Sequence, residues 1–123
     1  MTGVLTWAGV GVLGALGAYA RFYVGGAVTA RRPSDFPFGT FVVNLTGSFA
    51  LGVLVGISAE ETVLLLLGTG LLGGYTTFST WMVEAQRLGE DATWTPMWLY
   101  LLGSMLAGVA TAGLGWIIGE AIK

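Results

Sequence analysis

The positions of the charged residues constrain this chain more than any other feature of its sequence. The chain has 123 residues, and its twelve charged residues leave uncharged runs at 1–20, 36–59, 62–83 and 92–119. At about 1.5 Å per helical residue, each run is long enough to cross a hydrocarbon core of roughly 30 Å. The sequence therefore predicts an all-α membrane protein, with four transmembrane helices in a single domain over residues 1–123.

Composition excludes several classes of function. Only 10% of the residues are charged, whereas a soluble domain usually carries about a quarter. The sequence has no cysteine and no histidine, which removes disulfides, thiolate metal sites and Cys or His nucleophiles. Since every acidic residue also lies near the end of a predicted span, we do not expect an enzyme. No basic cluster is present, so membrane lipid is an expected partner and nucleic acid is not.

The helices are expected at about residues 4–24, with a tilted extension toward residue 30, and at 39–58, 62–87 and 96–119. Prolines and charges mark a loop at 31–37, and the sequence Gly-Glu-Asp at 89–91 predicts a polar turn. Pro96 suits the first turn of the fourth helix. Because every linker is short, the helices should be neighbours in up-down order.

Small and polar residues recur every four positions in the second and fourth predicted helices. In the fourth helix they are Gly103, Ala107, Thr111, Gly115 and Gly119. Such a flat face predicts close helix packing. In the second helix they are Thr40, Asn44, Ser48, Gly52 and Gly56. An asparagine at mid-membrane needs hydrogen-bond partners, so Asn44 is expected to point into protein or water.

The third predicted helix has an unusual composition at its middle. Glycines at 68, 70, 73 and 74 are followed by Ser or Thr at 76, 77, 79 and 80. Each glycine weakens a helix by roughly 1 kcal/mol relative to alanine, and hydroxyls can pair with backbone groups that a break releases. We predict an unwound segment near residues 73–77, whose carbonyls could coordinate a cation. A kink without function is the alternative.

Three segments carry distinctive motifs: residues 14–22, residues 39–49 (GTFVVNLTGSF) and residues 73–80 (GGYTTFST). Together they resemble the Fluc (CrcB) fluoride channels, and the resemblance covers nearly the whole chain. The resemblance implies a fluoride-selective channel of the plasma membrane, which lets fluoride leave the cytoplasm passively and so lowers its toxicity. It also implies that helix 3 is broken near its middle and that two chains form an antiparallel, dual-topology dimer with two pores.

The resemblance also implies a site for a cation and several pore residues. Backbone carbonyls of Gly73 and Thr76 from both subunits would hold a structural, non-transported Na⁺ at the dimer centre. Phe78 matches the first of two pore phenylalanines, and Trp81 occupies the position of the second. Asn44 matches a pore asparagine whose amide can donate to an anion.

Further positions match an implied polar track and its entrances. The hydroxyl groups of the track correspond to Ser79, Thr80, Tyr100 and Ser104. Gly108 stands where some family members have another serine, which interrupts the track. Arg21 corresponds to an arginine that attracts anions at the vestibule, and Glu84 to an acid at the pore mouth.

Other interpretations differ in the partner or in the transported ion. A small multidrug or guanidinium exporter depends on a buried acid in helix 1, and residues 1–20 contain none. A purely structural subunit is a further alternative. The side expected to hold both termini carries Lys123 as its basic residue, whereas the other side carries Arg31, Arg32 and Arg87. This bias favours both termini outside, so a homodimer and one half of an obligate heterodimer both stay open.

Overall fold

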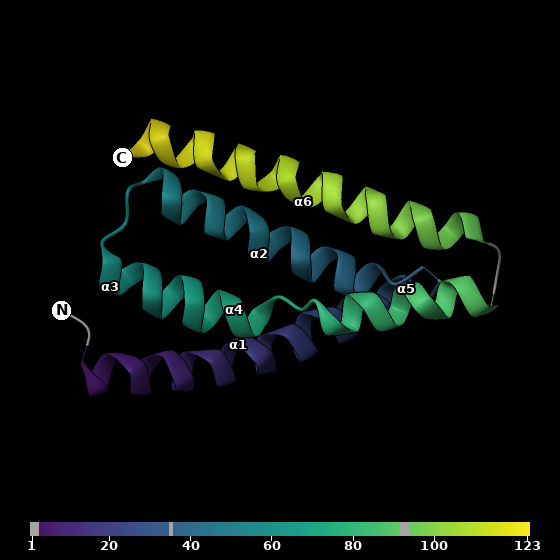
Figure 1. Cartoon of the computed structure of the whole chain (residues 1–123), viewed down its shortest axis with the longest axis horizontal. Helices are drawn as coiled ribbons and strands as arrows, with labels where there is room; N and C mark the ends of the chain where they lie inside the picture. Colours follow the sequence, from purple (N-terminus) through teal and green to yellow (C-terminus); the bar gives the residue numbers. More distant parts are fainter. Residues whose placement is uncertain (1–2, 35, 92–93) are drawn as a thin grey trace.

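The computed structural model describes residues 3–34, 36–91 and 94–123, which are helical apart from short connections (Figure 1). The elements are α1 (Val4–Arg31), α2 (Phe38–Gly56), α3 (Glu61–Val63), the π-helix η1 (Leu64–Leu72), α4 (Gly73–Tyr75), α5 (Ser79–Asp91) and α6 (Trp94–Ile122). Within the described ranges, four helices are long and apolar enough to cross a membrane: Val4–Arg31, Phe38–Gly56, Glu61–Glu90 and Trp94–Ile122. The prediction of an all-α chain with four such helices is confirmed.

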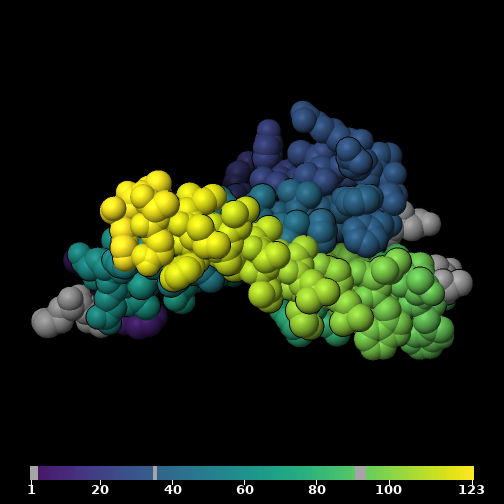
Figure 2. Space-filling model, turned by 90° about the horizontal axis from the view of Figure 1, so that it is seen from above, coloured from purple at the N-terminus to yellow at the C-terminus, as the bar shows by residue number. Residues whose placement is uncertain are grey.

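The chain runs back and forth along one long axis. In Figure 1, α6 lies beside α2, α2 beside the α3–α5 segment, and that segment beside α1. The start of α1, the α2–α3 connection and the end of α6 lie at one end of the molecule. The up-down order expected from the short linkers is therefore observed. Figure 2 shows α6 along the outside of the molecule over its whole length.

Glycines bring α2 and α6 into close contact. A Cβ atom added at Gly52 would collide with the Ala112 carbonyl oxygen, and one at Gly119 would lie 2.6 Å from the Val53 carbonyl oxygen. The packing face predicted on the fourth helix is therefore confirmed toward its C-terminal end. Toward the N-terminal end it makes no contact of this kind, because a Cβ at Gly103 would meet no described atom within 4 Å.

The glycines of the third span act differently from the prediction. Gly74 is helical, and a Cβ there would collide with the backbone of Gly14 in α1. This glycine lets α1 approach, because the neighbouring backbone fills the space that a side chain would need. The α-helical geometry ends one residue later, since Thr76 is extended (φ −80°, ψ 162°), and α5 begins at Ser79.

Two further features of the third span were not expected. The predicted polar turn at residues 89–91 is wrong, because α5 continues through Asp91. Gly89 lies against α6, since a Cβ there would be 2.8 Å from the sulfur atom of the flexible Met97 side chain. The π-helix η1 directly precedes α4 and the extended Thr76. π-Helical turns within α-helices are frequently found at functional sites.

Candidate functional site

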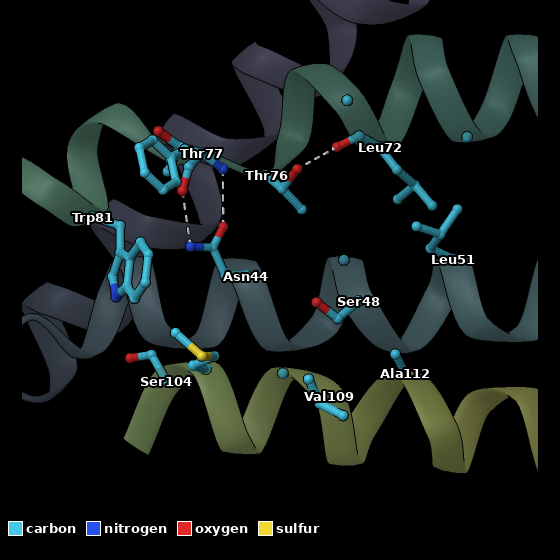
Figure 3. A pocket seen from close by; sticks show the side chains of 16 residues that line it. Asn44, Ser48, Leu51, Leu72, Thr76, Thr77, Trp81, Ser104, Val109 and Ala112 are labelled. Atoms are coloured by element: carbon cyan, nitrogen blue, oxygen red, sulfur yellow. Dashed lines mark hydrogen bonds between the residues drawn. The ribbon is translucent and has the colours of Figure 1, made fainter. Parts of the chain in front are cut away.

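A groove of about 540 Å³ opens between the third span, α2 and α6 (Figure 3). Its polar lining comes from Asn44, Ser48, Thr76, Thr77, Trp81 and Ser104. Most of the remaining lining is apolar, and none of the described residues that line the groove is charged. The groove follows the segment between α4 and α5, so its shape depends on the end of α4.

The side chain of Asn44 holds this segment through two hydrogen bonds. Its Nδ2 donates to the Thr77 carbonyl oxygen at 2.9 Å, and the Thr77 N–H donates to Asn44 Oδ1 at 2.9 Å (Figure 3). A side-chain amide thus pairs with both polar groups of a backbone residue that lies outside any helix. Since Nδ2 carries two donors, one N–H of Asn44 is left for another acceptor.

Side chains also stabilise the helix ends beside this segment. At the end of α4, Thr76 Oγ1 donates to the Leu72 carbonyl oxygen at 2.9 Å, and Arg21 Nε donates to the Gly74 carbonyl oxygen at 3.3 Å. At the start of α5, the Thr80 N–H donates to Thr77 Oγ1 at 3.2 Å. Hydroxyl acceptors at helix starts and cationic donors at helix ends satisfy backbone groups that the helix leaves free.

Aromatic residues line one end of the groove and continue behind it. Phe78 is 70% exposed in the single chain and packs edge-on against Trp81, with ring centroids 5.6 Å apart. On the other side, Trp81 contacts the fully buried Tyr100 at a centroid distance of 6.5 Å. Trp81 Nε1 and Ser104 Oγ are buried and have no hydrogen-bond partner among the described residues.

A second hollow of about 510 Å³ lies on the other side of Thr77. Its polar lining comes from Arg21, Thr29, Thr40, Thr77, Thr80 and Glu84. The Glu84 carboxylate accepts a hydrogen bond from the Tyr100 hydroxyl at 3.3 Å. Because Thr77 lines both hollows, the pair of Asn44 and Thr77 separates the groove from this second, polar space.

The structure thus divides the residues that the sequence singled out. The groove brings together Asn44, Phe78, Trp81, Ser104, Gly73 and Thr76. The second hollow holds Arg21, Thr80 and Glu84, while Ser79 is exposed and lines neither space. Tyr100 lines neither, although it contacts members of both groups.

Three polar residues at this site were not singled out as site residues from the sequence. Thr77 acts through its backbone and its hydroxyl, Ser48 lines the groove and Thr40 lines the second hollow. The stripe of Thr40, Asn44 and Ser48, spaced by four on the second helix, was a signal for two of them. Thr77 lies in the run of hydroxyl residues that predicted the unwound segment.

Four helices that are long and apolar enough to cross a membrane define a small multi-pass membrane protein. The chain belongs to the CrcB family, because the family model described as "CrcB-like protein, Camphor Resistance (CrcB)" matches residues 8–116. Relatives of this chain are named as ion channels, so the family is non-enzymatic and an exporter of organic cations is not favoured.

Similar relatives span nearly the whole chain. "Fluoride-specific ion channel FluC 2" of Mycolicibacterium paratuberculosis is 43% identical over 122 residues, which cover 99% of this chain and 100% of the relative. "Fluoride-specific ion channel FluC 1" of Geobacillus kaustophilus is 43% identical over 111 residues, covering 90% and 95%. "Fluoride-specific ion channel FluC 2" of Clostridium acetobutylicum is 38% identical over 114 residues, covering 93% and 94%.

Proposed function

We propose that this chain forms a fluoride-selective channel through which fluoride leaves the cytoplasm passively, and that it thereby lowers fluoride toxicity. The observation that carries the proposal is the relative named as a fluoride-specific channel, which is 43% identical over 99% of this chain. A potential of 100 mV, negative inside, favours the exit of one negative charge by about 2.3 kcal/mol. Passive exit therefore needs no energy source other than the membrane potential and the fluoride gradient.

The chemistry of the groove supports a small anion as the permeant species. Asn44, Trp81 and Ser104 offer an amide, an indole and a hydroxyl donor, and no charged side chain is among the described lining residues. Neutral donors can replace the water around a strongly hydrated anion without holding it as tightly as a fixed cation would. Arg21 and Glu84 belong to the second hollow, where a charge can act on ions before they enter the groove.

We further propose that the channel is an antiparallel, dual-topology dimer in the plasma membrane. Polar groups at mid-span support a protein partner, because lipid offers them no hydrogen bonds. Thr46 is exposed in the single chain, and its hydroxyl lies 2.9 Å from the Tyr75 hydroxyl. Phe78 is exposed beside the groove, so a second chain could complete the wall at that point.

A structural Na⁺ at the dimer centre is part of this proposal. Gly73 is the first residue of the short helix α4 and is exposed, and Thr76 directly follows that helix. Among the described residues, neither carbonyl accepts a hydrogen bond from a side chain or from backbone outside the helices. Neutral carbonyl oxygens suit a hard cation. When bound, the ion would join the two third spans, with Gly73 and Thr76 of each chain as ligands.

The charges at the two ends bear on the choice of partner. Lys123 lies at the end that holds the start of α1, whereas Arg31 and Arg32 lie at the opposite end, where α1 finishes. The end of a membrane protein with more basic residues tends to lie on the cytoplasmic side. A homodimer whose two chains insert in opposite orientations therefore needs a small difference in basic residues between the two ends. We propose that the chain forms a homodimer. The alternative is an obligate heterodimer with a homologous partner, and a test of the chain alone distinguishes the two.

The experiment is to purify this chain alone, place it in liposomes and follow anion release with fluoride and chloride electrodes. Fast fluoride release with negligible chloride release is expected, and it would show that one chain suffices. Equal release of both anions would contradict selectivity. No release of either anion would contradict the homodimer, and restored release after addition of a partner of opposite charge bias would identify a heterodimer.

A further inference from the structure

Four aromatic rings form a continuous row from the connection between α1 and α2 to the groove. Phe36, which lies outside any helix, packs edge-on against Tyr100 of α6, with ring centroids 5.3 Å apart and an interplanar angle of 85°. Tyr100 contacts Trp81 of α5 at a centroid distance of 6.5 Å, and Trp81 contacts Phe78 at 5.6 Å. Of the four rings, those of Trp81 and Phe78 line the groove. The row therefore joins a residue outside the groove to two residues of its wall.

The backbone around Phe36 is ordered by local contacts. The Phe36 N–H donates to Ser34 Oγ at 3.1 Å, and the Phe36 carbonyl oxygen accepts a hydrogen bond from the Phe38 N–H at 2.9 Å. Pro37 follows directly, and the residue before a proline is restricted to extended conformations because the proline ring crowds its backbone. The half-buried ring of Phe36 also contacts the rings of Phe38 and Phe41, at centroid distances of 4.7 and 6.0 Å. These contacts favour one position of the ring.

Phe36 also packs against the small hydrophobic core of the described chain. The buried members of this core are Ala85 and Leu88 of α5 and Tyr100 of α6, and Phe36 reaches them from outside the helices. In lipid, apolar surface alone gives little drive for helices to associate, so their association depends on close packing. Since α5 packs chiefly on α6, Phe36 links this helix pair to the start of α2.

Tyr100 connects Phe36 with both spaces of the site. Tyr100 is fully buried, and in a closely packed interior its ring cannot tilt without displacing its neighbours. Its hydroxyl donates at 3.3 Å to Glu84, which lines the second hollow, and its ring contacts Trp81 of the groove. Phe36 itself lines neither space. A change at Phe36 therefore acts on the groove through Tyr100.

We propose that Phe36 is a positioning residue of the channel, which holds Tyr100 and thereby keeps Trp81 and Phe78 in the orientation that conduction requires. The inference rests on the proposed channel function and extends it to the connection between α1 and α2. Edge-to-face pairs stabilise an arrangement of rings beyond what burial alone provides. An aliphatic side chain of similar bulk therefore cannot replace Phe36. The shape of the groove wall then depends on a residue that does not touch the permeating ion.

The first test follows Trp81 without measuring flux. In detergent micelles of the full chain, the indole ¹H–¹⁵N resonance of Trp81 is assigned through its loss in Trp81→Phe. Phe36→Leu, which removes the ring and keeps apolar bulk, should shift or broaden this resonance and leave that of the exposed Trp98 in place. Phe38→Leu is the matched control, because among the described aromatic pairs this half-buried ring contacts Phe36 and not Tyr100. An unmoved Trp81 resonance in Phe36→Leu, or an equal shift in Phe38→Leu, would overturn the proposal.

The second test measures fluoride release from liposomes. Phe36→Leu should lower the initial rate about two- to tenfold, the factor by which one edge-to-face pair changes a conformational ratio. Phe36→Tyr keeps the ring and should restore most of the rate, whereas Phe38→Leu should release fluoride at close to the parental rate. Parental release from Phe36→Leu, or an equal loss in Phe36→Tyr, would overturn the proposal.

A third measurement needs no variant and separates the outcomes further. Nuclear Overhauser effects between the ring protons of Phe36 and Tyr100 should be detected in the parent chain. Their absence would overturn the proposal even if Phe36→Leu fails to fold. A parent that releases fluoride, combined with an unmoved Trp81 resonance in Phe36→Leu, would overturn the positioning role alone. A parent that releases no fluoride, alone or with a partner, would overturn the proposed function and the positioning role in conduction together.

Discussion

Replacing Asn44 with leucine removes both hydrogen bonds to Thr77 while keeping a side chain of similar size. The Thr77 N–H and carbonyl groups would then lack their partners, which are both 2.9 Å away in the parent. A buried, unpaired polar group costs about 1–3 kcal/mol. Because this site is only partly buried, the lower part of that range applies to each group, which gives about 2–4 kcal/mol for the pair. The native conformation of the segment should then be disfavoured by a factor of roughly 30 to 1,000.

We expect Asn44→Leu to abolish fluoride release from liposomes. The variant should still elute as a dimer in size-exclusion chromatography. Hydrogen exchange followed by mass spectrometry should show faster exchange in peptides that contain Thr77. Thr111→Val in α6 is a suitable control, because the Thr111 hydroxyl donates to carbonyls of its own helix and lines neither hollow. Release close to that of the parent, together with a protected Thr77 amide, would refute the reasoning and remove Asn44 from the pathway.

Four further predictions concern Phe78, the proposed sodium ion and two glycines. Phe78→Ile should strongly lower fluoride release, because the positive aromatic edge is lost while apolar bulk remains; parent-like conduction would contradict the aromatic role. Exchange of all sodium for a large organic cation should weaken the dimer or its conduction, measured by cross-linking and efflux, and no change in either would argue against a central sodium. Gly52→Val should destabilise the protein by about 1–3 kcal/mol through overpacking against Ala112. Gly103→Ala, with open space around it, should leave the thermal unfolding temperature close to that of the parent.

The spans could be predicted from the sequence because charged side chains are costly inside a bilayer. The twelve charged residues leave four uncharged runs that are long enough to cross one. The packing role of Gly115 and Gly119 followed from spacing, since residues four apart lie on one helix face. Spacing could not show that Gly103 faces open space. A face of small residues can run along a whole helix even where a neighbouring helix contacts only part of it. Nor could composition distinguish a glycine that unwinds the chain from Gly74, which is helical and packs on Gly14.

The residues of the candidate site could be named from the sequence, but their role stays a prediction. Asn44, Trp81 and Ser104 line one groove, and no observation tests whether an anion passes them. The contribution of Thr77 could not be read from its side chain, because its contact with Asn44 uses backbone groups that every residue except proline possesses. The turn expected at residues 89–91 failed for a related reason. Gly, Glu and Asp favour turns locally, but here the helix continues through all three while α5 packs on α6.

The hydrogen bonds at the end of α4 bear on how the chain enters the membrane during synthesis. The Gly74 carbonyl is paired by Arg21 from α1, and the backbone of Thr77 is paired by Asn44 from α2. Both partners leave the ribosome before the third span does. If the third span were inserted first, the unpaired backbone groups between α4 and α5 would enter lipid. In this chain the two helices that pair with those groups come earlier in the sequence. The order of helices along the chain is therefore suited to vectorial assembly, and a circular permutation that begins at α3 would lose this advantage.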